Sequence, residues 1–238
     1  MARHFDLNAF TYAHRGLWSA DGHPENSLAA FKAAAEAGLG IEYDVRPSKS
    51  GEVMVFHDRT LTRMTGVEGV FEEQDMSVLE SLRLAECNQP IPTLEALLDI
   101  WPSSLPLLTE LKIDGETDPE AFAVAVGEQL MGHIGPAAAM SFSEPAVDAL
   151  PATLMRGQLI HPIRRTNETE FDAKLARALD RKVDYLAVNV DDAERAAVIL
   201  GGSLPFVVWT VRTMADVRRI RLLSGAVIFE HLPVPLAS

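Results

Sequence analysis

Carboxylate and ammonium side chains interrupt two otherwise apolar runs in the first half of the chain. Glu42 and Asp44 stand two residues apart in one run, and Glu110 and Lys112 stand two apart at the end of another. If both runs are strands, side-chain alternation places each pair on one face of the sheet. A buried carboxylate without a partner costs several kcal/mol, so a group of carboxylates predicts a cation among them. We therefore expect Glu42, Asp44 and Glu110 to bind one divalent ion.

Two histidines accompany these residues. Oxygen ligands without thiolates favour Mg²⁺ or Ca²⁺, with Mn²⁺ as a further candidate, over Zn²⁺. His14 and His57 each end an apolar run, and Arg15 follows the first of them. An ion with Arg15 and Lys112 can take the charge of a phosphate while the histidines move protons. The set predicts a phosphate site.

The one cysteine, Cys87, excludes an internal disulfide and a CxxC zinc site.

Each signal also has a structural explanation when taken alone. A Glu-x-Asp pair on a strand can be an ion pair, and Glu110 with Lys112 can be a self-contained salt bridge. His57-Asp58 can cap a turn, and a His-Arg-Gly tripeptide is unspecific. The joint placement of these residues at the ends of successive predicted strands favours the functional interpretation. Phosphate sites in barrels usually follow strands 7 and 8, so this placement departs from the common pattern.

Short apolar runs alternate with helix-like segments along the chain. The runs are residues 11–13, 41–45, 107–111, 137–142, 154–160, 185–190, 206–211 and 226–229. Strand-then-helix units with short loops predict parallel strands joined by helical crossovers. Eight such units in 238 residues predict a (β/α)₈ TIM barrel, with a doubly wound open sheet as the alternative. We expect one domain over residues 1–238, with an insertion over roughly 47–90 after the second strand.

Helix-capping residues precede most segments between the runs. The predicted starts are Ser27 (helix 28–37), Thr93 (helix 96–101), Asp118 (helix 121–131), Ser143, Asn167, the N-cap pair Asp191-Asp192, and Thr213. Within the insertion, the run 53–56 is followed by a polar stretch, in which Glu72, Glu73 and Glu80 predict a solvated face.

Charge and composition exclude several classes of partner. The chain has 21 Lys and Arg against 34 Asp and Glu, a net charge of −13. Nucleic acid and anionic membrane surfaces are therefore not expected as partners, because both require clustered cations. We expect no signal peptide and no membrane anchor, since apolar stretches are short and the N-terminus carries Asp6 and Asn8. These features predict a soluble, cytoplasmic protein, either monomeric or a homodimer.

The same residues belong to an ordered set of motifs. In chain order these are Ala13-His14-Arg15-Gly16, Pro24-Glu25-Asn26-Ser27, Glu42-Tyr43-Asp44-Val45, His57-Asp58, Leu61-Thr62-Arg63, Ile91-Pro92-Thr93-Leu94-Glu95, Glu110-Leu111-Lys112, Ser141-Phe142 and Trp209-Thr210-Val211. Over nearly its whole length the chain resembles the glycerophosphodiester phosphodiesterase family of (β/α)₈ barrels. The insertion resembles the small cap of the bacterial-type members.

The resemblance implies a role for each residue of the set. It implies hydrolysis of a small-molecule glycerophosphodiester, such as glycerophosphocholine or glycerophosphoethanolamine, to glycerol 3-phosphate and an alcohol. The implied roles are metal binding for Glu42, Asp44 and Glu110, acid–base catalysis for His14 and His57, phosphate binding for Arg15 and Lys112, and support for Glu25 and Asn26. Trp209 is expected either to contact the glycerol or alcohol of the substrate at the barrel mouth or to be part of the core.

The C-terminal part departs from the family pattern. Arg212 stands where the family commonly has Asn, and Glu230-His231-Leu232-Pro233 replaces an Asp-x-Pro. These changes fall at the rim where the leaving alcohol is expected, so they concern substrate preference. Two other functions stay open: a lysophospholipase D or phospholipase C-like phosphodiesterase, and a non-catalytic phosphodiester-binding module. The complete set of histidines, carboxylates and cations argues against the binding module.

Overall fold

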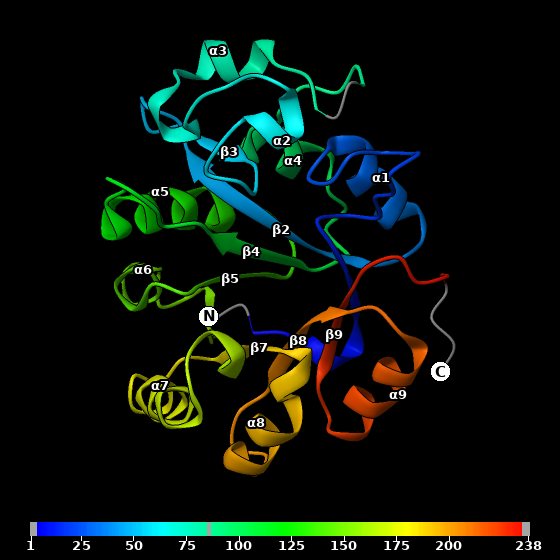
Figure 1. Ribbon diagram of the computed structural model, residues 1–238, viewed down its shortest axis with the longest axis vertical. Coiled ribbons are helices and arrows are strands. Elements are labelled where there is room, and N and C mark those ends of the chain that lie inside the picture. Colours follow the sequence, from blue (N-terminus) through cyan, green and yellow to red (C-terminus); the bar gives the residue numbers. More distant parts are fainter. Residues whose placement is uncertain (1–3, 85–86, 235–238) are drawn as a thin grey trace.

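The computed structural model describes residues 4–84 and 87–234 of the chain, and eight parallel strands close into a barrel (Figure 1). The strand order is β1-β9-β8-β7-β6-β5-β4-β2, and β1 pairs with β2 to complete the circle. The predicted (β/α)₈ barrel is confirmed. Its strands are β1 (Thr11–His14), β2 (Gly40–Pro47), β4 (Leu107–Leu111), β5 (Ala137–Ser141), β6 (Met155–Leu159), β7 (Tyr185–Asn189), β8 (Phe206–Val211) and β9 (Ala226–Phe229).

Helices cover the outside of the barrel. They are α1 (Leu28–Glu36), α4 (Leu94–Ile100), α5 (Pro119–Gly132), α6 (Glu144–Ala149), α7 (Glu168–Asp180), α8 (Ala193–Leu200) and α9 (Met214–Leu222), with 3₁₀ turns η1 (Leu7–Ala9), η3 (Ile163–Arg165) and η4 (Val190–Asp192). Most begin at the predicted caps; the Ser27 hydroxyl, for example, accepts a hydrogen bond from the Ala30 N–H at 3.1 Å. Among the described helices, none combines the length and apolar character needed to cross a bilayer.

Helices α4 and α5 each begin two residues before the predicted start, at Leu94 and Pro119, and the cap predicted at Asp192 does not form. Helix α4 begins at Leu94, two residues before the expected start, because Thr93 caps it directly by accepting the Ala96 N–H. Asp192 lies at the N-cap position of α8 but makes no side-chain cap bond. Its carboxylate instead accepts the N–H of Ile163 at 3.1 Å, so it ties the turn after β6 to the end of β7.

The predicted insertion forms a compact unit on β2. It contains β3 (Val53–Val55), antiparallel to β2, followed by α2 (Thr62–Thr65), η2 (Phe71–Glu73) and α3 (Met76–Ser81), drawn in cyan shades at one end of β2 (Figure 1). The segment expected to be polar has an apolar core of its own, made of Met54, Phe56, Leu61, Met64, Phe71, Leu79, Leu84 and Ile91. The expectation of a solvated face is wrong for Glu72, which pairs with the buried guanidinium of Arg46 on β2.

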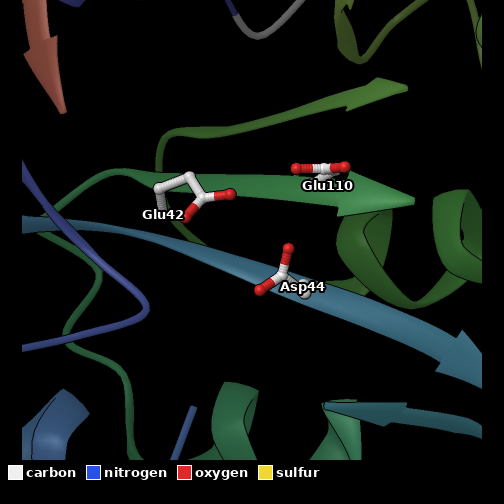
Figure 2. Close-up of side chains that lie close together, drawn as sticks. All are labelled: Glu42, Asp44 and Glu110. Carbon is white, nitrogen blue, oxygen red and sulfur yellow. The ribbon is translucent and has the colours of Figure 1, made fainter. Parts of the chain in front are cut away.

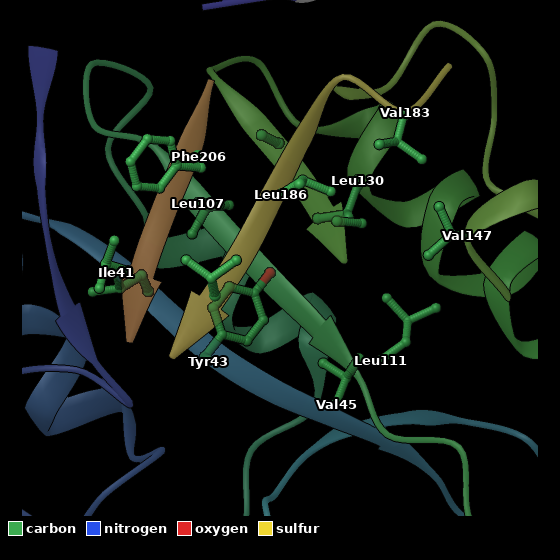
Figure 3. Close-up of a cluster of buried hydrophobic side chains, with 14 of the residues drawn as sticks. Ile41, Tyr43, Val45, Leu107, Leu111, Leu130, Val147, Val183, Leu186 and Phe206 are labelled. Carbon is green, nitrogen blue, oxygen red and sulfur yellow. The ribbon is translucent and has the colours of Figure 1, made fainter. Parts of the chain in front are cut away.

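Alternation along β2 separates the apolar core from the site. Ile41, Tyr43 and Val45 point outward into the layer between strands and helices (Figure 3). Glu42 and Asp44 therefore point into the barrel, as the period of a strand requires. Below them the interior is filled by apolar side chains, and close packing is possible because β6 carries Gly157. A Cβ at that position would lie 2.2 Å from the ring of Tyr185.

Candidate active site

Three carboxylates meet at the carboxyl ends of β2 and β4. Glu42 pairs in register with Leu108 and Asp44 pairs with Glu110, so the inward positions of the two strands are neighbours. Each carboxylate offers an oxygen within 4.8 Å of the other two, and all three side chains are buried (Figure 2). Glu42, Asp44 and Glu110, hereafter the carboxylate triad, thus lie together where the sequence places them. Such a set of hard oxygen donors suits a Mg²⁺ or Ca²⁺ ion.

Lys112 lies beside two members of the triad. Its Nζ is 2.9 Å from Asp44 Oδ1 and 2.5 Å from Glu110 Oε1. Burial alone would lower the pKa of Lys112, but the charges of Asp44 and Glu110 raise it above its usual value. Burial would likewise raise the pKa of Asp44, yet Lys112, His57 and Arg15 hold it well below its usual range. Asp44 and Lys112 are therefore both charged near neutral pH.

Glu42 is the member of the triad that lacks a sufficient partner. Its Oε2 is buried and makes no hydrogen bond to any described residue. Burial, together with the negative charges of Asp44 and Glu110, raises the pKa of Glu42 well above its usual range. A divalent ion between the three carboxylates would remove both penalties, because it supplies the missing partner and cancels the repulsion. The residues therefore fit a metal ion.

Asn26 and Glu25 support the triad from the loop before α1. Asn26 Nδ2 donates to Asp44 Oδ2 at 2.9 Å, and its backbone N–H donates to the Arg15 carbonyl at 2.9 Å. Both Asn26 and Arg15 have φ of 57°, a left-handed conformation that asparagine tolerates well. Arg15 Nε lies 3.3 Å from Asp44, and its Nη1 donates to Glu25 at 2.8 Å. The loop thus aims Arg15 at the triad.

His14 ends β1 and lies between two carboxylates. Its Nδ1 is hydrogen-bonded to Glu230, and its Nε2 is 3.7 Å from Glu42 Oε2. Burial raises the pKa of Glu230, but the hydrogen bond and charge of His14 and the charge of Arg212 outweigh it, so the pKa falls to about 2. An ionised carboxylate can only accept, so Nδ1 carries the proton and Nε2 is left to face the triad. Burial lowers the pKa of His14 itself.

His57 resembles His14 in that its Nδ1 is also bonded to a carboxylate. Its Nδ1 bonds Asp58 Oδ1 at 2.7 Å, and Arg63 Nε donates to the other oxygen of Asp58 at 2.6 Å. Burial opposes ionisation of Asp58, but the bonds from His57 and Arg63 lower its pKa below the usual range. Arg63 also donates two hydrogen bonds to Glu25. One network therefore runs from His57 through the insertion to Arg15.

These residues line one cavity of about 660 Å³ at the mouth of the barrel, hereafter the main cavity. Its lining includes both histidines, Arg15, Lys112, and Glu42 and Glu110 of the triad. Trp209 lines the opposite wall; its indole N–H has no partner among the described residues, and its ring meets Phe142 edge-on at 6.0 Å. The predicted site residues thus gather in one place, with Asn26 and Asp44 just behind the cavity wall.

Sequence reasoning did not assign Glu230 to the site. The residue directly follows the last predicted strand, so the rule that selected the other strand-end residues could have found it. His161 stacks on Phe142 with ring centroids 4.2 Å apart. His4 lies outside the site, with its Nε2 3.6 Å from Asp184 Oδ1. His23 is exposed and absent from the lining of the main cavity.

The fold and the site define a (β/α)₈-barrel protein whose carboxylate triad and paired histidines lie at the carboxyl ends of the strands. The model of the glycerophosphoryl diester phosphodiesterase family matches residues 14–142, more than half of the chain. The chain belongs to this family, and the resemblance seen in the sequence is confirmed.

Individual relatives agree with this assignment. Glycerophosphodiester phosphodiesterases of Caldanaerobacter subterraneus and Bacillus altitudinis are 35% and 33% identical over 101 and 99 residues. These alignments cover 40% and 37% of this chain, and the chain spans only 41% and 38% of the length of the two relatives.

Solved structures match over most of the chain. A glycerophosphodiester phosphodiesterase of Thermotoga maritima has a TM-score of 0.76 at 28% identity, covering 92% of this chain and 93% of that one. An Oleispira antarctica phosphodiesterase, in complex with the product sn-glycerol-3-phosphate, has a TM-score of 0.79 at 23% identity, covering 93% and 92%. The latter likeness shows the shared barrel fold.

Proposed function

We propose that this protein is a phosphoric diester hydrolase that cleaves a glycerophosphodiester to glycerol 3-phosphate and an alcohol with the help of a divalent ion. The observation that carries the proposal is the meeting of the carboxylate triad with His14 and His57 in one cavity. Membership of the family, and the product sn-glycerol-3-phosphate in the Oleispira antarctica relative, support the choice of substrate.

Cations around the triad would bind the substrate's phosphate. The ion, held by Glu42, Asp44 and Glu110, would supply positive charge for the non-bridging phosphate oxygens. Arg15 and Lys112 lie against the same carboxylates and line the main cavity, so each can reach a phosphate oxygen. Both lie on backbone next to the triad, so the site is preorganised for an anion.

Two proton transfers remain for the histidines. Hydrolysis requires a base that takes the proton from the attacking oxygen and an acid that gives one to the leaving alkoxide. His14 and His57 are each held at Nδ1 by a carboxylate, Glu230 and Asp58, which leaves each Nε2 to exchange a proton. The attacking oxygen is either that of water or the neighbouring glycerol hydroxyl, which would give a cyclic phosphate that water then opens.

A metal-depletion assay tests the proposal. Turnover of glycerophosphoethanolamine should disappear in EDTA and return with Mg²⁺, Ca²⁺ or Mn²⁺. The variants Glu42→Gln and Glu110→Gln should each lose roughly 10³-fold or more in kcat/KM, because a bound ion contributes several kcal/mol of charge stabilisation. Glu128→Gln, an exposed change on α5, is the matched control and should keep full activity.

Two outcomes would contradict this function. Full activity of a metal-stripped sample would contradict the proposal that the triad binds an ion that the reaction needs. Faster cleavage of micellar lysophospholipid than of glycerophosphoethanolamine would favour a lysophospholipase D.

The lone Cys87 supports a reducing compartment, the cytoplasm, as the proposed location.

A further inference from the structure

A second cavity adjoins the main cavity at the barrel mouth. It measures about 590 Å³. The two cavities share His57, Glu110, Lys112, Phe142 and Arg165 in their linings, so these residues form the ridge between them. A phosphate held at Lys112 beside the triad would therefore face both cavities. Because a phosphodiester carries two alcohol groups on one phosphorus, each cavity can receive one of them.

The acidic residues of the second cavity are all engaged by cations. Glu110 is paired with Lys112, and Asp58 accepts hydrogen bonds from Arg63. Asp114 is 2.8 Å from Nη2 of Arg46. No carboxylate in the described lining is therefore left to attract a cationic head group.

Two arginines of the same cavity have no such engagement. Arg59 follows His57-Asp58 in the insertion, and Arg165 ends the η3 turn after β6, so they approach the cavity from different segments. Within residues 4–84 and 87–234, neither guanidinium has a hydrogen bond or an ion pair. A further cavity beside Arg59 is lined by Glu72 and Asp114, both bound by Arg46, and by Glu73, Glu116 and Asp118; none of the five is hydrogen-bonded or ion-paired to Arg59. Both arginines are exposed, so their guanidinium groups are accessible to an anionic ligand even though the chain carries a net charge of −13.

The wall of the main cavity that carries Arg164, Trp209 and Arg212 has the opposite character, because its two arginines are paired. Arg164 bonds Asp191 at 2.7 Å, and Arg212 bonds Glu230 at 2.6 Å. Trp18 and Trp209 add aromatic surface to this wall. Neutralised charges and aromatic rings suit an uncharged polyol such as the glycerol group.

We propose that the second cavity receives the leaving alcohol and that Arg59 and Arg165 select alcohols that carry an anionic group, a carboxylate or a phosphate. This inference rests on the proposed diester hydrolysis. It places the leaving alcohol away from Arg212 and Glu230, where the sequence led us to expect it. Arginine forms bidentate hydrogen bonds with both anions, so either source would be recognised by the same chemistry.

Matched substrate pairs test the selection. Glycerophosphoserine differs from glycerophosphoethanolamine by one carboxylate, and glycerophosphoglycerol can be compared with its terminal phosphate monoester. The wild-type protein should prefer the anionic member of at least one pair by roughly 5–20-fold in kcat/KM, the range expected for a charge-assisted hydrogen bond at a partly exposed site. The pair with the larger ratio identifies carboxylate or phosphate as the preferred group.

Charge-removing variants locate the effect. Arg59→Gln and Arg165→Gln should each lower kcat/KM for the preferred anionic substrate by about 5-fold or more and change that of its uncharged counterpart less than about 2-fold. The double variant should lose the preference. Arg218→Gln on α9, exposed and absent from the linings of both cavities, is the matched control and should change neither value.

The outcomes separate this inference from the proposed function. A wild-type protein that cleaves none of these diesters overturns both. Cleavage without a preference for the anionic members overturns the selection alone. An equal loss on both members of a pair in Arg59→Gln and Arg165→Gln would show that the arginines bind the scissile phosphate, and this too overturns it.

Discussion

The two halves of the barrel mouth hold their charges in different ways. On the half built by β1, β2 and β4, the charged side chains of the site are largely buried and held by neighbours: Asp44 is 0% exposed, and Glu42 is 2% exposed. On the half built by β6 to β9, the arginines are exposed, and the side chain of Arg212 is 58% exposed. We therefore expect the first half to bind the phosphate and perform the chemistry, and the second half, together with Arg59 of the insertion, to contact the two alcohol groups of the substrate.

Strand pairing explains why the first half suits chemistry. His14 pairs in register with Glu42, and Asp44 pairs with Glu110, so four site residues are fixed by the hydrogen-bond ladder. Catalytic groups need such preorganisation, because small displacements cost rate. The family model also matches this half, ending at residue 142.

Loops and turns carry the charged side chains of the second half. Arg164 and Arg165 lie on η3, a short turn that can change without disturbing the barrel. Trp209, on β8, is placed by a strand instead. Glu230 directly follows β9 and bonds His14 in the first half. It is therefore the residue through which the second half acts on the proposed chemistry.

The largest expected effect is the loss of kcat when a histidine of the first half is replaced. His14→Ala and His57→Ala should each lower kcat by roughly 10²–10⁴, the usual range for loss of a general acid or base. The double variant should be far less than additively worse, because the pair acts as a unit. Steady-state kinetics on glycerophosphoethanolamine measure the effect, and His4→Ala, which changes an exposed histidine outside the site, should keep full activity.

A substrate whose leaving group needs no proton shows which histidine is the general acid and which is the general base. Glycerol phosphodiesters of p-nitrophenol should largely restore the rate of the variant that lacks the acid and leave the other variant slow. Near-normal rates in both single variants, or restoration of neither, would contradict the division of labour between His14 and His57.

A smaller effect is expected from the second half. Trp209→Ala should raise KM by about 10-fold and change kcat less than about 3-fold, because packing against the substrate is lost equally in the ground and transition states. Trp209→Phe keeps an aromatic face and should stay near the wild type. A fall in kcat as large as that of His57→Ala would place Trp209 in the chemistry and break the comparison.

The smallest effect concerns the connection between the halves. The pKa of Glu230 lies at about 2, below its usual 4.5, so the stability it provides is complete above pH 4.5 and is lost as the pH falls toward 2. Glu230→Gln should therefore reduce the free energy of unfolding at pH 7 by about 1–2 kcal/mol, and the difference from wild type should shrink below pH 4.5.

Urea unfolding in EDTA at several pH values measures this difference. Glu128→Gln, an exposed change on α5, should show no pH-dependent difference. A gap between wild type and Glu230→Gln that is constant from pH 7 to pH 3 would mean that ionisation of the Glu230 carboxylate does not contribute to stability.

The sequence by itself determined the barrel and the triad. Period-two alternation places Glu42 and Asp44 inside β2 while Ile41, Tyr43 and Val45 face the helices, and this pattern is local to one strand. Caps such as Ser27 are also local, because a hydroxyl bonds an N–H three residues later. The fold and the residues of the triad could therefore be predicted without knowing what packs against them.

Tertiary structure decided the contacts that cross the barrel. Glu230 is 216 residues from His14, and no local pattern indicates that their side chains meet. Asp192 has the sequence of a helix cap, but a nearby N–H of Ile163 competes for its carboxylate. Arg59 and Arg165 look like ordinary surface arginines until closure of the barrel brings the insertion and η3 to one cavity. Pairing between distant segments depends on which strands become neighbours, and that is a property of the closed barrel.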